Sequence, residues 1–283
     1  MHRGFALLLL LLLPSWGSAQ ELLVPPEHHE WASFPEGSWK QIKQVTETFK
    51  DGELLSSMTT TLTIRLKEVG RDFIVLEREA KSEVSGQVFE KPIREFRSGI
   101  NGQTGSQRVL ITPGGEQKLS ILGKSYQCEV RQMEVLGEPT KVTGKVFYQP
   151  DTPPYILRRE HAFTPKGADA PEKKMVSEVI ALDKPYPVLT EIKTVAFIVQ
   201  KTTSAEETTE TVEAQCVDVP GFVVGTWMTA YDAEGKLKSK TTVQLLNYEV
   251  ATEKMIPATT NKPGLFRNKR QQRRLFDEGT SAK

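Results

Sequence analysis

Hydrophobic and polar residues alternate along most of this chain, which is the pattern of strands with one buried face. The alternation starts at Trp39 and is clearest at Leu62, Ile64 and Leu66, which polar residues separate. The segments expected to form strands are 39–49, 54–66, 73–79, 87–89, 109–111, 119–122, 126–135, 141–149, 155–163, 175–182, 191–201, 208–219, 223–231 and 237–250. Because no long amphipathic helix interrupts them, the sequence predicts a mainly β fold with few helices.

Short turns join these segments. Asp51-Gly52 and Asn101-Gly102 are turn dipeptides, and residues 113–115 (Pro-Gly-Gly) are expected to form another turn. Strands joined by tight turns pair antiparallel, so we expect a curved antiparallel sheet or an open barrel built from hairpins.

The expected β domain covers residues 39–250. A proline- and charge-rich stretch at 164–174 suggests two sub-lobes, 39–163 and 175–250. Residues 52–59 and 235–242 share Gly, Leu, Ser and Thr at matching positions, which fits either a duplication or two hairpins built alike.

Residues 1–19 have the features of a cleaved export signal. A short basic start precedes an apolar run at 5–13, and Gly17 and Ala19 have the spacing that a signal peptidase reads. This run is too short to cross a bilayer, which needs about 20 apolar residues. The sequence therefore predicts an exported protein, periplasmic or secreted, with no transmembrane segment.

The expected mature chain begins at Gln20, which offers no thiol for a lipid anchor. Residues 20–38 are rich in proline and charge and are expected to form an extended, solvated arm. Export also bears on Cys128 and Cys216, because disulfides persist outside the cytoplasm. Each cysteine lies in an alternating segment on the apolar face, so the pair either forms a disulfide or remains as two separate buried thiols.

Charge is balanced over the chain but concentrated at its end. With 37 basic and 36 acidic residues the formal net charge is +1, which does not indicate a specific nucleic-acid binder. The expected flexible tail, 251–283, contains a basic run without acidic residues. Its basic residues are Lys262, Arg267, Lys269, Arg270, Arg273 and Arg274. This run either docks on an anionic surface or serves as a disordered, solubilising tail.

No motif for catalysis, metal binding or a cofactor stands out. The chain lacks Gly-x-Ser-x-Gly, His-Glu-x-x-His and Cys-x-x-Cys motifs. His28-His29-Glu30 could bind a metal, but we interpret it as part of the solvated arm, and His161 as part of an exposed charge ladder. Carboxylate pairs such as Asp151 and Glu160 could serve a hydrolase, but abundant carboxylates make such pairs common. We therefore assign no catalytic residue, no metal ligand and no cofactor.

Several local motifs resemble those of uncharacterised secreted bacterial proteins. They are Gly37-Ser38-Trp39, the Asp51-Gly52 hairpin, Tyr126-Gln127-Cys128, residues 148–155 with Pro153-Pro154, and residues 232–237. More distantly, the succession of long strands is similar to periplasmic lipoprotein-carrier folds, in which a curved sheet surrounds an apolar cavity. The first resemblance implies no known activity, and the second rests on architecture alone.

The function expected from the sequence is that of an exported, non-catalytic binding or envelope-associated protein, with an apolar ligand held in the concavity of the sheet. One alternative is a surface-interaction protein that docks on an anionic polymer or membrane through its basic tail. A hydrolase is the third and least favoured hypothesis. The identity of the ligand and the oligomeric state do not follow from the sequence.

Overall fold

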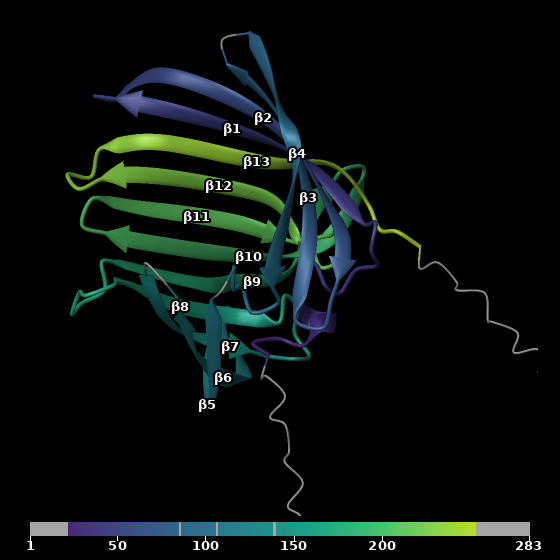
Figure 1. The fold of residues 1–283 in the computed structure, drawn as a ribbon, viewed down its shortest axis with the longest axis vertical. Helices are drawn as coiled ribbons and strands as arrows, with labels where there is room; N and C mark the ends of the chain where they lie inside the picture. The colour runs from purple at the N-terminus through teal and green to yellow at the C-terminus, as the bar shows by residue number, and fades with distance from the viewer. Residues whose placement is uncertain (1–21, 85, 106, 138–139, 253–283) are drawn as a thin grey trace, which may run out of the picture. The chain divides into compact units, whose positions relative to one another are not determined.

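A computed structural model describes residues 22–252, except 85, 106 and 138–139. These residues form a single antiparallel sheet (Figure 1). Its strands are β1 (Trp39–Lys50), β2 (Glu53–Val69), β3 (Phe73–Val84), β4 (Gln87–Gly99), β5 (Arg108–Ile121), β6 (Lys124–Leu136), β7 (Thr140–Tyr148), β8 (Ile156–Pro165), β9 (Lys173–Val188), β10 (Glu191–Ser204), β11 (Glu207–Gln215), β12 (Val223–Asp232) and β13 (Leu237–Glu249). The predicted mainly β, antiparallel fold built from hairpins is confirmed.

The sheet is open. Neighbouring strands follow the chain order, except that β1 pairs with β13 inside the sheet, and β4 and β5 form its two edges. β5 nevertheless contacts β9 across the three strands between them, which shows that this end of the sheet is rolled. Both edge strands contain a proline, Pro92 in β4 and Pro113 in β5, as expected where backbone amides need no partner.

The sheet runs without a break where the sequence suggested two sub-lobes. β8 and β9 pair directly, from Arg158 opposite Glu178 to Phe163 opposite Lys173. The stretch 164–174 is therefore the connection within one hairpin rather than a division between lobes. The expected turn at 113–115 also differs, because β5 continues through it with a register shift between Pro113 and Glu116.

Residues 22–38 differ from the extended, solvated arm that we expected. They contain a 3-10 helix, η1 (Pro26–His28), followed by turns. Trp31 and Phe34 are buried against Ile64 and Leu66 of β2, and Leu23 packs on the far end of the sheet against β5, β6 and β7. The apolar residues of this segment lack strand periodicity, but burying them is favourable, so the arm joins the core at both ends of the sheet.

Among the described residues, the core consists of four clusters of buried residues. Cys128 of β6 lies in one cluster with Val130 and Phe147, and Cys216 lies in another with Val195 and Val224. Both cysteines are free in the structure, and four strands separate β6 from β11, the strand before Cys216. The structure thus shows two separate buried thiols rather than a disulfide. No helix in the described part of the chain is long and apolar enough to cross a membrane.

Candidate functional site

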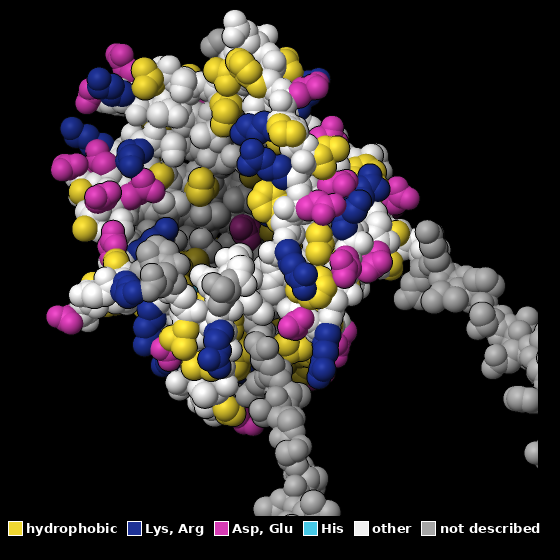
Figure 2. Space-filling model, viewed as in Figure 1, with side chains coloured by type: hydrophobic (Ala, Val, Ile, Leu, Met, Phe, Trp, Pro, Cys, Tyr) yellow, Lys and Arg dark blue, Asp and Glu magenta, His cyan; other side chains and the backbone are white. Residues whose placement is uncertain are grey.

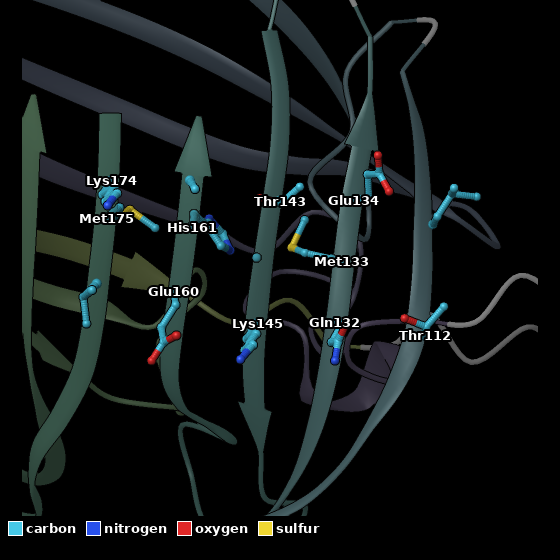
Figure 3. A pocket seen from close by; sticks show the side chains of 14 residues that line it. Thr112, Gln132, Met133, Glu134, Thr143, Lys145, Glu160, His161, Lys174 and Met175 are labelled. Atoms are coloured by element: carbon cyan, nitrogen blue, oxygen red, sulfur yellow. The ribbon is translucent and has the colours of Figure 1, made fainter. Parts of the chain in front are cut away.

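The rolled end of the sheet contains a cavity of about 520 Å³, lined by residues of β5 to β9. Its walls come from two rows of cross-strand partners, which lie on the same face of the sheet because directly paired residues share a face. One row is Leu110, Glu134, Thr143, Ala162 and Lys174, and the other is Thr112, Gln132, Lys145, Glu160 and Val176. Figure 3 shows both rows, with Met175, His161 and Met133 between them.

The two rows of the cavity wall combine apolar side chains with polar and charged ones. Leu110, Ala162 and Val176 contribute apolar side chains, and Leu110 is 43% exposed although it lies on a strand. Figure 3 shows the charged side chains of Glu160 and Lys145 in the same row. A concavity that brings apolar side chains and charged groups together can hold a small molecule that has both kinds of group.

The acidic and basic groups of the cavity differ in their partners. Glu134 forms an ion pair with Lys141, and Glu160 pairs with Arg158, so both carboxylates are neutralised by residues that do not line the cavity. Among the described residues, Lys145 and Lys174 have no carboxylate within ion-pair distance. The cavity therefore has two ammonium groups available to an anionic ligand.

The row between these two rows also lines the cavity, although side chains alternate between the two faces along a strand. It contains Met133, Gly144, His161 and Met175, each paired with the next. Nε2 of His161 is buried and has no hydrogen-bond partner among the described residues. Burial, together with the positive charge of Arg159, lowers the pKa of His161 to about 4. The imidazole is consequently neutral at neutral pH.

Residues 28–30, which we interpreted as solvated, instead fix the arm to the sheet. Nδ1 of His28 lies 2.6 Å from the hydroxyl of Tyr148, and the His28 ring stacks on Tyr155 with 3.9 Å between ring centroids. Nδ1 of His29 accepts hydrogen bonds from the backbone amides of Trp31 and Ala32. The contacts of His28 hold the arm against the sheet, and those of His29 stabilise a turn within the arm.

A buried lysine lies beneath the arm. Lys40 of β1 is 5% exposed and donates hydrogen bonds to the carbonyl oxygens of Gly221 and Val223. Its ammonium also lies over the ring of Trp31, 5.5 Å from the centroid. Burial lowers the pKa of Lys40 to about 8, against the opposing effect of Glu30 and Glu213.

The space-filling view shows a hollow in the described unit, with charged side chains around its rim (Figure 2).

Some of the predicted site residues lie far from one another in the structure, and others lie outside the residues that it describes. Lys262, Arg267, Lys269, Arg270, Arg273 and Arg274 lie outside the described residues, as does the export signal at 1–19. Within the described part of the chain, no group of three or more His, Cys, Asp or Glu residues is placed to hold a metal ion. The cysteines are buried in separate clusters.

Comparison with known proteins adds little to this description. Neither a protein-family model nor a curated protein matches the chain. A solved structure from Bacteroides fragilis, of a protein presumed to be exported and described as having a YmcC-like fold, is 12% identical, with a TM-score of 0.29. The match covers 76% of this chain and 97% of that chain. A likeness at this level carries no argument about the function of this chain.

Sequence reasoning missed Lys145 and Lys174 as site residues. Both stand in ordinary alternating strands, where a lysine normally faces solvent. What distinguishes these two lysines is a tertiary feature and not a sequence pattern. β5 rolls towards β9, which places the sheet face that carries both lysines on the inside of a cavity.

Proposed function

We propose that the protein is an exported binding protein that holds a small amphiphile, with an apolar body and an anionic head group, in the cavity of β5 to β9. The single observation that carries this proposal is a cavity with two unpaired ammonium groups beside exposed apolar side chains. Its volume of about 520 Å³ falls in the range of sites for small ligands.

The charges favour an anionic head group over a cationic one. Lys145 and Lys174 lie in adjacent rows of the wall, on β7 and β9, whereas the two glutamates already have basic partners. An incoming cation would have to compete with Arg158 and Lys141. An anion meets no such competition and gains two charge-assisted contacts.

The apolar side chains favour a ligand with a short hydrocarbon body. The apolar residues of the wall are Leu110 on β5, Ala162 on β8 and Val176 on β9, so a chain laid across β5 to β9 would bury them. Burying apolar area contributes about 25 cal/mol per Å². Binding would therefore combine a hydrophobic contribution with a salt-dependent electrostatic one.

Titration calorimetry with dodecanoate tests this proposal, with dodecanol as the neutral comparison. We expect dodecanoate to bind the wild-type protein, and the double variant Lys145→Gln/Lys174→Gln to lose about 100-fold or more in affinity for dodecanoate, since each of the two charge-assisted hydrogen bonds contributes about 1.5–3 kcal/mol. Lys118→Gln/Lys124→Gln is the matched control, because both lysines lie on β5 and β6 outside the cavity.

A second variant tests the cavity without changing its charge. Ala162→Trp fills the space between Thr143 and Lys174 on the cavity face and should reduce the binding of both dodecanoate and dodecanol. Native mass spectrometry of the gently purified protein should also detect a bound amphiphile. Equal dodecanoate affinity in the wild type, the double-lysine variant and Ala162→Trp would contradict the proposal.

A further inference from the structure

An exposed tryptophan lies on β12, away from the cavity of β5 to β9. Trp227 is 41% exposed, and none of the residues that line the cavity belongs to β12. β12 lies between β11 and β13, and Trp227 pairs with Val212 on one side and with Thr242 on the other (Figure 1). Single exposed apolar residues are common, but this ring is held in one orientation.

The indole is folded back along its own strand onto a glycine. A Cβ atom at Gly225 would lie 3.1 Å from Cη2 and 3.6 Å from Cζ3 of Trp227, so the far end of the ring covers Gly225. Residues two apart on a strand share a face of the sheet, and the absence of a side chain at Gly225 leaves room for the ring. The indole thus lies along the strand, and the side of the ring that faces away from the strand is open to solvent.

A tyrosine hydroxyl borders the same end of the ring. The Cβ position at Gly225 also lies 3.1 Å from Oη of Tyr186, which therefore stands near Cη2 of Trp227. Tyr186 packs edge-to-face on Phe197, with 6.0 Å between ring centroids. Its hydroxyl forms no hydrogen bond with another described residue. A packed aromatic pair thus fixes one border of the indole and presents a free hydroxyl there.

Polar side chains border the indole on its other side. Thr242 on β13 is the cross-strand partner of Trp227. Gln244 is likewise the partner of Gly225, and Lys43 of β1 continues that row, so these side chains share the face of the indole. All three are exposed, and none forms a hydrogen bond or ion pair with another described residue. Hydroxyl, amide and ammonium groups are therefore available to a ligand that rests on the ring.

We propose that Trp227, with Tyr186, Thr242 and Gln244 around it, is a binding site for a pyranose ring of an oligosaccharide or polysaccharide. A pyranose carries C–H groups on its faces and hydroxyl groups along its edge. The face of an indole is electron-rich and attracts the C–H groups, while the polar border supplies partners for the hydroxyls. An open aromatic ring with hydrogen-bonding groups around it therefore matches both parts of a sugar.

The polar border argues against an apolar occupant. A lipid or the apolar core of a protein partner would bury Thr242 and Gln244 without hydrogen bonds, which is unfavourable. Within β12, all of which the structure describes, Trp227 is the only large hydrophobic residue that is exposed. No wider apolar patch on this strand therefore extends the ring into a hydrophobic docking surface.

A nucleobase is the other planar ligand that stacks on an indole. Binding of a single-stranded nucleic acid also needs a basic groove that follows the phosphate backbone. Lys201, on the neighbouring strand β10, is already paired with Glu210 of β11, which leaves less positive charge for phosphates. The charges on this side of the sheet thus favour a sugar over a nucleic acid.

Indole NMR of the full chain tests this site. The ¹⁵N-labelled protein would be titrated with cellohexaose, chitohexaose and hexagalacturonate, which include neutral and acidic pyranoses. We expect the indole N–H resonance of Trp227 to shift with at least one of them. Trp31 is 5% exposed, and Trp39 donates its indole N–H to Glu249, so these two resonances serve as internal controls and should not move in parallel. A preference for hexagalacturonate that Lys43→Gln removes would assign the acidic class of sugar.

Substitutions assign the contacts, with affinity measured by calorimetry for the saccharide that responds. Trp227→Ala should weaken binding by about tenfold or more, the order of loss when an aromatic side chain that stacks on a ring is removed. Thr242→Val and Gln244→Ala should each weaken binding by about two- to tenfold, as expected for the loss of one hydrogen bond. Trp39→Ala is the matched control and should bind as the wild type does. Circular dichroism of the same samples reports their folding.

Wild-type affinity in Trp227→Ala would overturn the proposal, as would a Trp227 resonance that none of the saccharides moves. A shift caused by hexathymidylate and by no saccharide would assign the ring to a nucleic acid and would also overturn it. Saccharide binding should be retained in Lys145→Gln/Lys174→Gln, because these lysines lie on β7 and β9. The outcome is therefore independent of the amphiphile experiment.

Discussion

The imidazole of His161 lies across Gly144, its cross-strand partner, so closely that a methyl group there would stand 2.5 Å from Cδ2. The same methyl group would lie 2.6 Å from the carbonyl oxygen of Glu160. Gly144 is therefore required by close approach rather than by an unusual backbone angle. This contact determines where the only histidine of β8 points.

Replacing Gly144 with alanine should destabilise the protein by about 1–3 kcal/mol, the usual cost of overpacking. Urea unfolding followed by circular dichroism measures this change. The double variant Gly144→Ala/His161→Ala should recover part of the loss, because the imidazole is gone but the Glu160 carbonyl remains. A single variant as stable as the wild type would show that the ring and the strand move apart without cost.

Lys40 should give the protein an alkaline pH dependence. Its pKa is about 8 in the folded state, against 10.5 for an unperturbed lysine. Between these values the unfolded chain holds a proton that the folded protein has lost, so the free energy of unfolding rises with pH. The rise from this residue amounts to at most about 3 kcal/mol between pH 8 and 10.5.

Urea unfolding over that pH range, in the wild type and in Lys40→Met, isolates this contribution. Stability relative to Lys40→Met should increase from pH 8 to 10.5. Lys43→Met is the matched control, since Lys43 is exposed on the same strand. Parallel curves for the wild type and Lys40→Met would contradict the expectation.

The N-terminal arm should contribute substantially to stability. Trp31 is 5% exposed and packs in the cluster of β2 and β3, so Trp31→Ala should cost about 3–5 kcal/mol. Hydrogen exchange of residues 22–38 should increase in the same variant. Trp227 is 41% exposed, and Trp227→Ala should cost less than about 1 kcal/mol. Similar losses in both variants would argue against the arm as part of the core.

Both cysteines should be free thiols in the purified protein. Cys128 and Cys216 are buried, and burial raises the pKa of each thiol, so neither should react with iodoacetamide under native conditions. In guanidinium without a reductant, mass spectrometry should detect two labels. Labelling that appears only after reduction would instead reveal a disulfide and a different arrangement of β6 relative to β11.

The strands were predictable because a half-buried strand must alternate between apolar and polar residues, as at Leu62 to Leu66. Edge strand β4 extends to Gly99, well beyond the expected 87–89, because an exposed edge needs no such alternation. The arm was misjudged since Trp31 and Phe34 are buried by residues distant in sequence.

The candidate site was harder to foresee than the fold. Lys145 and Lys174 share a cavity because β5 curls towards β9, a consequence of packing between distant residues. His161 reaches across β7 since a single glycine faces it. Neither arrangement leaves a periodic signal in the sequence.

The pairing of β1 with β13 has a consequence for how the chain could be cut. Trp39 lies opposite Glu249, so the first and last strands of the chain pair inside the sheet, while the consecutive strands β4 and β5 stand at opposite edges. A circular permutant that joins the two ends and opens the chain between Gly99 and Arg108 would run from one edge to the other as an uninterrupted meander. In that order every strand would pair with its sequence neighbour, and the most distant contact of the present chain would become a local hairpin.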